Sequence, residues 1–587
     1  MPTCKHLVLL ETSGNQEYLF ATNRLQENVG ASELTYQAGT KFVLEAIGDP
    51  DIGGGPDLTD YNNTPGRLRQ LLSKHTARNG IEVIIATSGK ALFLTSDFEV
   101  GRQIIAAATR RALRDAPGLD LFGMISEGFD WETESVHDCL ETLYQRFESL
   151  RGSRPQPSAR FPMLPVCEPC ASSGLPAWDL DTEGDPVSRQ SWQKRQAAEG
   201  WRKRIIKILK PKKHWVGKRL DHLEQLGELD EDFTGLDWTA VVHADGNGFG
   251  RIFRELPHYL NGAAGSAGFN EHYVSALRRL SLALEEATEE AFCEALKVLP
   301  KITKRVRVKP RTEDKPRWDK HEILPIVPLV LGGDDLTVVC EGRHALAFTW
   351  TFLEAFEKQT ERTDLFGGIA PEIAKKTGGN HLSACAGVAI TKPHFPFYSG
   401  YTLAEQLLRS AKTIKQKIQH CSAMDFHVLY DASFTGLDAI RRRLLQDNET
   451  TALTAKPYVV TDPAKLEAVG PDDWVANHHV QNLWERVQVI NARDEEGRRK
   501  LPNSQLHALR EALSMGHVQA DARLRLICHH YPDLDNLLDN SVGGSLFRET
   551  GESDSGKPCR ETGFLDALDS AAFWEKGRHD DAANTDE

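Results

Sequence analysis

The chain has 587 residues, of which 40% are hydrophobic and 26% are charged, and its formal net charge at pH 7 is −14. This composition is typical of a soluble globular protein with about three to five domains, and the negative charge argues against a protein that coats nucleic acid non-specifically. No run approaches the roughly 20 apolar residues that a membrane span needs, and the N-terminus carries no cleavable signal, so we expect a cytoplasmic protein with no membrane partner.

Apolar runs bounded by turn residues alternate with helical patterns, which predicts an α/β (α+β) architecture. The predicted strands are Leu7–Leu10, Val83–Ala86, Ala91–Thr95, Leu119–Ile125, Ala240–His243, Ile326–Leu331, Leu336–Cys340 and Ala384–Ile390. The predicted helices include Val100–Ala116, His137–Leu150, Asn270–Leu299, His344–Arg362 and Leu403–Gln419. After residue 430 the patterns are mainly helical.

The order of these elements indicates two related ferredoxin-like palm domains of the βαββαβ type. We predict a degenerate palm at 1–150, a zinc-knuckle-like module with a basic linker at 151–232, a second palm at 233–430 and a helical C-terminal domain with an acidic tail at 431–587. When the two halves are laid side by side, Ser13, Lys90 and Ala91 stand where the second half has acids. Only the second palm is therefore expected to hold a metal.

The first chemical motif of the second palm is a strand that ends in an aspartate. Asp245 is followed by Gly246, Asn247, Gly248 and Phe249 at the start of a helical segment. The turn places a carboxylate at the end of the strand, and its glycines let the backbone approach a phosphate closely, because no Cβ stands in the way. We expect these four residues after Asp245 to bind nucleotide.

The second motif is a Gly-Gly-Asp-Asp turn between two strands, formed by Gly332, Gly333, Asp334 and Asp335. If both motifs lie at one edge of one sheet, three catalytic carboxylates converge. The candidate magnesium ligands are Asp245, Gly246, Asp334 and Asp335. Hard oxygen ligands suit two Mg²⁺ or Mn²⁺ ions, which activate an attacking hydroxyl and neutralise charge on a leaving pyrophosphate.

Together these motifs resemble the large palm-domain subunit of type III CRISPR effector complexes, the Cmr/Csm large-subunit family. The resemblance implies a nucleotidyltransferase of antiviral defence that joins ATP into cyclic or linear oligoadenylates. It implies nucleotide contacts for Ser383, on the strand Ser383–Ile390, and for Lys412, on the following helix, where it could reach a triphosphate. It also implies guide and target RNA and other effector subunits as partners.

Two features depart from that family. Many members begin with an HD nuclease domain, whereas this chain is expected to start at the first palm. The pairs His137-Asp138 and His579-Asp580 lack companion histidines, so we predict no DNA nuclease activity. Cys167 and Cys170 have the spacing of a zinc knuckle, but no second pair follows, so zinc would need a histidine such as His214.

Two other functions stay open. A diguanylate-cyclase-like enzyme would use GTP, but its signature has Glu and then an aromatic residue after Gly-Gly-Asp, where this chain has Asp335 and Leu336. Alternatively, the palm binds nucleotide without catalysis, as a scaffold in an RNA-guided complex. The basic stretch 201–220 interleaves Trp and Ile with Lys and Arg, which suits either an RNA or protein partner or an amphipathic helix with a solvated face.

Overall fold

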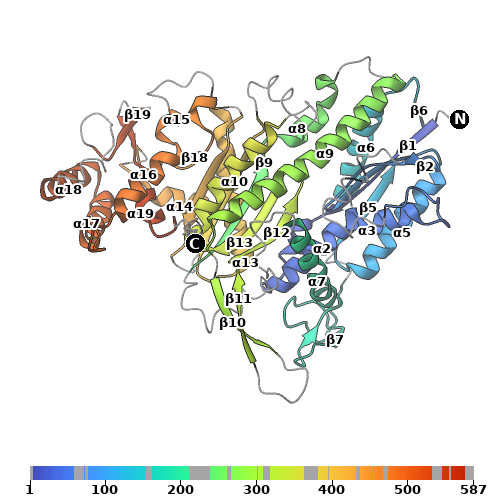
Figure 1. Ribbon diagram of the computed structural model, residues 1–587, viewed down its shortest axis with the longest axis horizontal. Helices are drawn as coiled ribbons and strands as arrows, with labels where there is room; N and C mark the ends of the chain where they lie inside the picture. The colour runs from blue at the N-terminus through green and yellow to red at the C-terminus, as the bar shows by residue number, and fades with distance from the viewer. Residues whose placement is uncertain are drawn as a thin grey trace, which may run out of the picture.

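The computed structural model defines the positions of most of the chain (Figure 1). The residues that it describes are 4–58, 70, 72, 77–153, 161–209, 238–260, 266–300, 302–308, 317–362, 381–393, 395–418, 420–430, 436–447, 450–466, 474–531, 545–553 and 557–574. His214, His579 and the acidic tail lie outside these residues. No helix in the described ranges is both long enough and apolar enough to cross a bilayer.

The first palm is an antiparallel sheet with the strand order β2-β3-β4-β1-β5, and β6 pairs with the free end of β1. In chain order its strands are β1 (Cys4–Ser13), β2 (Ala77–Arg78), β3 (Ile81–Thr87), β4 (Lys90–Thr95), β5 (Asp120–Ile125) and β6 (Phe129–Asp130). Its helices are α1 (Asn15–Leu19), α2 (Leu25–Gly39), α3 (Lys41–Gly48), α5 (Phe98–Asp115) and α6 (Val136–Ser153). The order β3-β4-β1-β5 is that of a ferredoxin-like βαββαβ unit, as predicted.

The second palm repeats that order and extends it, giving a sheet β12-β13-β9-β14-β15-β18. Its strands are β9 (Thr239–Gly246), β12 (Ile326–Gly332), β13 (Asp335–Glu341), β14 (Ala384–Thr391), β15 (Ala423–Val428) and β18 (Tyr458–Val459). Its helices are α8 (Phe249–Arg254), α9 (Ala267–Ala295), α10 (Ala345–Thr360) and α13 (Phe397–Lys412). Strands β10 (Ile302–Val308) and β11 (Arg317–Ile323) form a separate hairpin that projects from this domain (Figure 1). The predicted duplication of the fold is confirmed.

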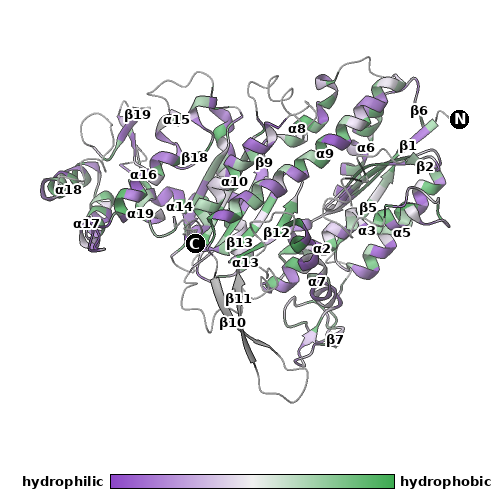
Figure 2. Ribbon diagram, viewed as in Figure 1, coloured by the Kyte–Doolittle hydropathy of each residue, from purple (hydrophilic) through white to green (hydrophobic). Residues whose placement is uncertain are grey.

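Strand β14 lies inside the second palm, and every one of its residues is buried. Such a strand has no polar alternation because both of its faces are covered, and Figure 2 shows the sheet as predominantly hydrophobic. Helix α13 packs very closely on β14 at Gly387, where a Cβ would lie 2.1 Å from the carbonyl oxygen of Ala404. This close contact fixes where α13 ends and therefore where Lys412 lies.

Helix α9 joins the two palms, running across both of them in Figure 1. Its Arg278 donates to the Val83 carbonyl at 3.1 Å and to the Glu82 carboxylate at 2.6 Å, both on β3 of the first palm. Near its start, the Asn270 side chain accepts from the Val136 amide and donates to the carbonyls of Trp131 and Glu134. Because these polar groups are buried and paired, they fix the two palms relative to each other.

The module between the palms is anchored by helix α7 (Arg189–Leu209), which packs along α2 of the first palm; its short strands are β7 (Asp179–Leu180) and β8 (Pro186–Val187). The helices touch at Gly30, where a Cβ would lie 1.6 Å from the Lys194 carbonyl oxygen. Glu33 of α2 pairs with Arg204 of α7 at 3.0 Å. The first nine residues of the predicted basic stretch, 201–209, are thus part of a helix packed on the first palm.

The C-terminal region is mainly helical, as predicted, with α14 (Leu437–Arg443), α15 (Trp474–Asn477), α16 (Val480–Asn491), α17 (Asn503–Ser514), α18 (His517–His530) and α19 (Phe564–Ser570). It also contains a small sheet, in the order β16-β17-β20-β19, that the sequence analysis missed. Its strands are β16 (Leu445–Gln446), β17 (Thr451–Ala452), β19 (Arg548–Glu552) and β20 (Pro558–Glu561). Strands β16 and β17 have only two residues each, and β19 and β20 contain no fully buried residue. None of the four therefore carries the alternation that a sequence pattern could reveal.

Candidate active site

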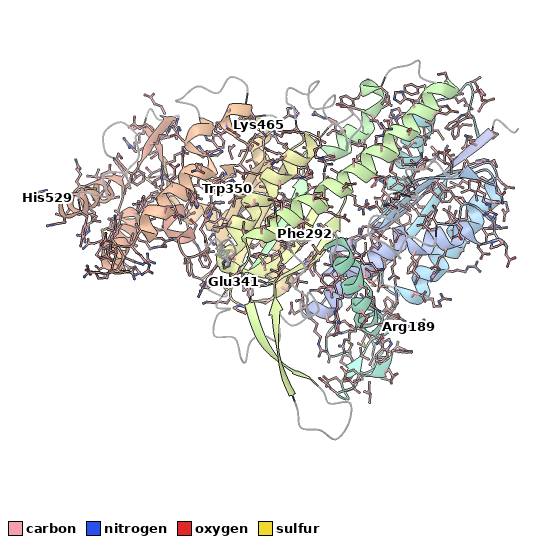
Figure 3. All side chains as sticks on the ribbon, in the orientation of Figure 1. Arg189, Phe292, Glu341, Trp350, Lys465 and His529 are labelled. Atoms are coloured by element: carbon pink, nitrogen blue, oxygen red, sulfur yellow. The ribbon has the colours of Figure 1, made fainter. Side chains whose placement is uncertain are left out.

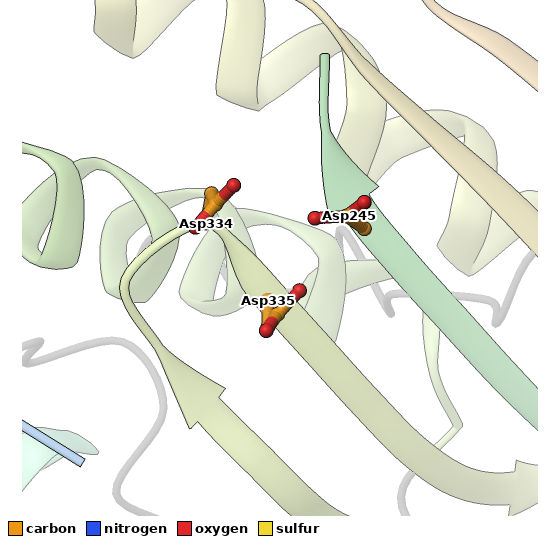
Figure 4. A group of neighbouring side chains, drawn as sticks. All are labelled: Asp245, Asp334 and Asp335. Carbon is orange, nitrogen blue, oxygen red and sulfur yellow. The ribbon is translucent and has the colours of Figure 1, made fainter. Parts of the chain in front are cut away.

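Three aspartates meet at one end of the second palm's sheet (Figure 4). Each of Asp245, Asp334 and Asp335 offers a carboxylate oxygen, and these oxygens lie within 4.8 Å of one another. Asp245 is near the end of β9, Asp334 lies in the β12–β13 turn and Asp335 begins β13. Among the described residues this is the one group of three or more His, Cys, Asp or Glu side chains close enough to hold a metal ion.

The sheet register explains why the acids converge. Leu336 pairs with Ala244, so Asp335 and Asp245, one position further along antiparallel neighbours, face each other across β13 and β9. Asp335 also closes the hairpin opposite Gly332, and Gly333 turns with a φ of 61°. Glycine adopts this left-handed conformation at no steric cost, which allows the tight turn that carries Asp334.

Gly246 has a packing role, while its predicted contacts with nucleotide and metal stay predictions. A Cβ at this position would lie 2.3 Å from the Phe249 ring and 2.8 Å from Cβ of Asp334. Phe249 is buried and packs edge-on against Phe356 of α10. The missing side chain of Gly246 therefore leaves room for Phe249 and lets the Asp334 turn approach β9. Gly248, with a φ of 75°, caps helix α8.

Asn247 ties the glycine-rich turn to the neighbouring strand. Its backbone amide donates to the Ser383 carbonyl at 2.8 Å, and its Nδ2 donates to Ser383 Oγ and to the Cys421 carbonyl, each at 3.0 Å. Ser383 is itself buried. The predicted nucleotide contacts of these two residues stay predictions, while the structure gives both a role in positioning the turn that follows Asp245.

Lys412, at the C-terminal end of α13, forms an ion pair with Asp245. Burial, together with repulsion from Lys415, lowers the pKa of Lys412 to about 8. Burial also lowers the pKa of Lys415, and nearby Arg251 adds to that effect. The three cations form a positive region beside the acids, which is the arrangement that a triphosphate next to a metal site requires.

The environment of Asp334 and Asp335 disfavours their ionised forms unless a cation is bound. Removal from water, followed by repulsion from Asp334, raises the pKa of Asp335 to about 8. Removal from water also raises the pKa of Asp334, although Lys90 acts in the opposite direction. Clustered carboxylates of this kind are stabilised in their ionised form by a divalent ion, and an all-oxygen donor set suits Mg²⁺ or Mn²⁺. The residues present therefore fit the predicted metal.

The corresponding place in the first palm holds an ion pair. There Leu10 pairs with Ala91 and Glu11 with Lys90, while Lys90 closes the hairpin opposite Thr87. By register, Glu11 corresponds to Asp245 and Lys90 to Asp335, and their side chains lie 3.4 Å apart. The predicted counterparts Ser13 and Ala91 are wrong, and Lys90 was matched to the wrong acid.

The error came from aligning the wrong glycine. A match of Ser13 with Asp245 places Gly14 opposite Gly246, and both glycines precede an asparagine. In the structure Gly14 and Gly248 are the equivalent residues, since each has a positive φ and caps the helix that follows. Glu11 lies three residues before Gly14, as Asp245 lies three before Gly248. At the positions that correspond to the three aspartates, the first palm thus has a single acid, Glu11, which Lys90 neutralises.

Two further residues of the site were missed from the sequence. Thr288 of α9 donates its hydroxyl to the Gly333 carbonyl at 2.6 Å and so fastens the Gly-Gly-Asp-Asp turn. Lys90 acts electrostatically on Asp334 from the other palm, and a Cβ on Gly332 would have Ser88 as its neighbour, at 3.9 Å. The β3–β4 turn of the first palm therefore faces the catalytic turn. Neither contact has a local sequence signal, because both depend on tertiary packing.

The predicted knuckle has no third metal ligand in the described part of the chain, and His214 lies outside it. Cys170 is buried among hydroxyls, with its Sγ 3.4 Å from Ser172 Oγ and 3.8 Å from Ser191 Oγ. Burial alone would raise the pKa of Cys170, but hydrogen bonds from Ser172 and Ser173 lower it to about 6. Zinc binding by Cys167 and Cys170 stays a prediction that needs ligands from elsewhere.

Of the two His-Asp pairs, the structure describes only His137-Asp138, at the start of α6. His137 Nδ1 lies 3.3 Å from the Tyr273 hydroxyl, and neither His137 nor Asp138 belongs to a metal-ligand cluster among the described residues. The absence of DNA nuclease activity stays a prediction.

Part of this chain is similar to known proteins. Residues 238–420 match the family model described as Cas10/Cmr2, second palm domain. No match was found among curated proteins. Among solved structures, Csm1 of T. onnurineus has 13% sequence identity and a TM-score of 0.47, with 98% of this chain and 70% of that chain covered. A Csm1–Csm4 cassette in complex with AMPPNP has 13% sequence identity and a TM-score of 0.46, with 97% of this chain and 70% of that chain covered. A Csm1–Csm4 cassette in complex with cA4 has 13% sequence identity and a TM-score of 0.44, with 97% of this chain and 69% of that chain covered.

Proposed function

We propose that this chain, whose residues 238–420 form a second palm domain of the Cas10/Cmr2 family, is a metal-dependent nucleotidyltransferase that joins ATP into cyclic or linear oligoadenylates in type III CRISPR defence. The observation that carries the proposal is the meeting of Asp245, Asp334 and Asp335 within 4.8 Å at the end of one sheet. The matched family model covers both motifs that supply these acids.

The three aspartates would hold Mg²⁺ or Mn²⁺. A divalent cation supplies two things in such a site, a lowered pKa for an attacking ribose hydroxyl and neutralisation of the charge that develops on pyrophosphate. The protein's own part is to fix the carboxylates before substrate arrives. Thr288 does so for the Asp334 turn, and Asn247 does so for the turn after Asp245. Such preorganisation matters because a displacement of about 1 Å can cost about a hundredfold in rate.

Lys412 has two successive partners in this mechanism. Without substrate it neutralises Asp245. With Mg²⁺ or Mn²⁺ held by the three aspartates, the Lys412 ammonium would turn from Asp245 to a phosphate oxygen of the triphosphate, where Lys415 would add further positive charge. The Gly332-Gly333 turn lets the donor phosphates lie against backbone, and the facing β3–β4 turn of the first palm, with Lys90, bounds the acceptor side.

The central experiment is incubation of the purified chain with Mg²⁺ and labelled ATP or GTP, with the product identified by mass spectrometry. D334N/D335N should abolish oligonucleotide formation, whereas the matched control Glu99→Gln, an exposed carboxylate on α5 paired with Arg102, should leave it unchanged. Full activity of the double variant would contradict the assignment. A GTP-derived product would favour the cyclase alternative.

The same assay separates the proposed settings of the enzyme. Product that requires guide and target RNA together with partner subunits supports a subunit of an RNA-guided effector complex. Product without RNA supports a synthase that works alone. Absence of product under every condition, with nucleotide still bound, would favour the non-catalytic scaffold over the enzyme.

A further inference from the structure

A cavity lies at the opposite end of the second palm's sheet from the acids, where the palm meets the C-terminal helices. It has a volume of about 540 Å³ and is lined by Trp238, Arg343, Trp484, Arg493, Arg499 and Trp574 among others. Trp238 immediately precedes β9, whereas Asp245 is near the end of that strand. A strand of that length places the two sites about 20 Å apart. The cavity therefore does not belong to the metal site.

The walls of this cavity come from separate parts of the chain. Arg343 follows β13 in the palm, Trp484 is on α16, Arg493 and Arg499 lie in the loop after α16, and Trp574 follows α19. Figure 3 shows the neighbouring Trp350 at this boundary, and its ring packs edge-on against both Trp484, at 6.3 Å, and Trp574, at 5.9 Å. The indoles are thus held in place before any ligand enters.

Two of the arginines stand directly opposite each other. Arg493 and Arg499 form an antiparallel β-bridge in the loop after α16, so their side chains leave the same short ladder. Like charges opposed in this way repel each other, and among the described residues neither arginine forms a salt bridge. Arg493 donates to the Gly497 carbonyl, while Arg499 donates to the Ile490 carbonyl and to Asn491 Oδ1. An anion between the two guanidiniums would relieve the repulsion.

The tryptophan-lined side of the cavity contains an indole N–H that can donate a hydrogen bond to a ligand. Trp574 is 4% exposed, and its Nε1 has no hydrogen-bond partner among the residues that the structure describes. A buried N–H without an acceptor costs about 1–3 kcal/mol, so its retention at a cavity wall points to an acceptor that the ligand brings. The ligand therefore needs a negative group for the arginines, a flat ring for the indoles and a hydrogen-bond acceptor.

We propose that this cavity binds a nucleoside phosphate, either a free nucleotide or one unit of a single-stranded RNA. A phosphate would lie between Arg493 and Arg499, which are suited to bidentate phosphate contacts, and the base would stack on an indole beside Trp574. The volume falls within the range of small-molecule sites, about 300–1,000 Å³. The proposal is independent of the metal-dependent synthesis, because no residue is shared.

The test is equilibrium binding of fluorescein-labelled decaadenylate RNA to the full chain, followed by fluorescence anisotropy in EDTA, so that the acid site holds no cation. R493Q/R499Q should weaken binding at least tenfold and reduce the salt dependence by about one phosphate contact. The matched control is Arg498→Gln in the same loop, because Arg498 is 72% exposed and already paired with Asp494 and Glu496. This control should bind like the unmodified chain.

One further variant and one displacement measurement test the role of Trp574 and the identity of the ligand. Trp574→Phe keeps an aromatic ring but removes the pyrrole ring with its N–H, and it should weaken binding several-fold while the variant stays folded. Displacement of the labelled RNA by ATP identifies a free nucleotide as sufficient, whereas displacement only by unlabelled decaadenylate identifies a unit within a strand. Equal affinities for R493Q/R499Q, Arg498→Gln and the unmodified chain would overturn the proposal, whatever the result of the synthesis assay.

Discussion

Lys90 Nζ and Glu11 Oε2 lie 3.4 Å apart in the first palm, at the two register positions that Asp335 and Asp245 occupy in the second. One copy of the fold thus neutralises an acid with a lysine, where we propose that the other copy does so with a divalent cation. Both side chains are less than a third exposed, so the pair is only partly screened by water.

The Lys90–Glu11 ion pair predicts that substitutions of the two residues lower local stability non-additively. Lys90→Met and Glu11→Gln should each lower the free energy of local unfolding of β1 and β4 by about 1 kcal/mol, because each leaves a partly buried charge unpaired. The combined variant should lose less than the sum of the two. Amide hydrogen exchange of the two strands measures these energies, and strictly additive losses would show that the pair contributes nothing.

Lys412 is expected to compete with a metal ion for Asp245 and to strengthen the binding of ATP. In Lys412→Met, the affinity for Mn²⁺ without nucleotide should rise about tenfold, because Asp245 loses its competing cation. The KM for ATP should rise by a similar factor, since a phosphate contact is lost. Electron paramagnetic resonance measures free Mn²⁺, and steady-state synthesis gives KM. Lys412→Arg serves as the charge-preserving control, and a fall in Mn²⁺ affinity in Lys412→Met would contradict the competition.

Thr288 is predicted to act only by positioning. Thr288→Val removes the 2.6 Å hydrogen bond to the Gly333 carbonyl while keeping the side-chain volume. The loss should cost about 1 kcal/mol of local stability and about tenfold in kcat, because the Asp334 turn loses its anchor. Thr288→Ser keeps the hydroxyl and should keep most of the activity. The KM of Thr288→Val for ATP should change little, because Thr288 is fully buried and acts only through the turn that it anchors.

The glycines of the site should differ sharply in tolerance. Gly246→Ala places a methyl group 2.3 Å from the Phe249 ring and 2.8 Å from Cβ of Asp334, and should lower kcat on the order of a hundredfold by displacing that acid. Gly332→Ala meets only Cβ of Ser88, at 3.9 Å, and should fold normally. Comparison of kcat and melting temperature for the two variants checks this. Equal effects would show that the close packing at Gly246 is not what matters.

The acids could be predicted from sequence because their signals are local. Asp245 ends an apolar run and precedes Gly246, and the pair Asp334-Asp335 follows an apolar run and two glycines. Strand ends and turns can therefore be recognised without knowledge of the strand pairing. The βαββαβ order was accessible for the same reason, since the long helices and buried strands have strong patterns.

The remaining features depend on register and tertiary packing. Glu11 can be recognised as the counterpart of Asp245 only from the strand pairing, because the shared Gly-Asn dipeptide suggested a different alignment. The contacts of Lys412 with Asp245 and of Thr288 with Gly333 join residues 167 and 45 positions apart in the sequence. No pattern within a single segment encodes such contacts, and side-chain partners between segments come only from the folded structure.

A buried lysine should make the stability of the first palm depend on pH. Lys194 of α7 is buried, donates to the Tyr18 carbonyl and lies over the Tyr18 ring. Burial lowers its pKa to about 7 from an ordinary value of 10.5, although Glu27, the charged group that faces it, acts in the opposite direction. The folded protein therefore releases a proton that the unfolded chain still binds between about pH 7 and pH 10.5.

Because the unfolded state binds more protons in that window, the free energy of unfolding should rise with pH by up to about 1.4 kcal/mol per pH unit. Below about pH 7 the lysine is protonated in both states, and its contribution to the slope disappears. Lys194→Met should remove the slope, since no proton is exchanged at that position. Hydrogen exchange of α2 and α7 amides at pH 7 and pH 9, corrected for the intrinsic rates, measures the difference.

The matched control is Lys203→Met, which changes a 69% exposed lysine of the same helix and should keep the slope of the unmodified chain. A slope that survives in Lys194→Met would assign the pH dependence to another group.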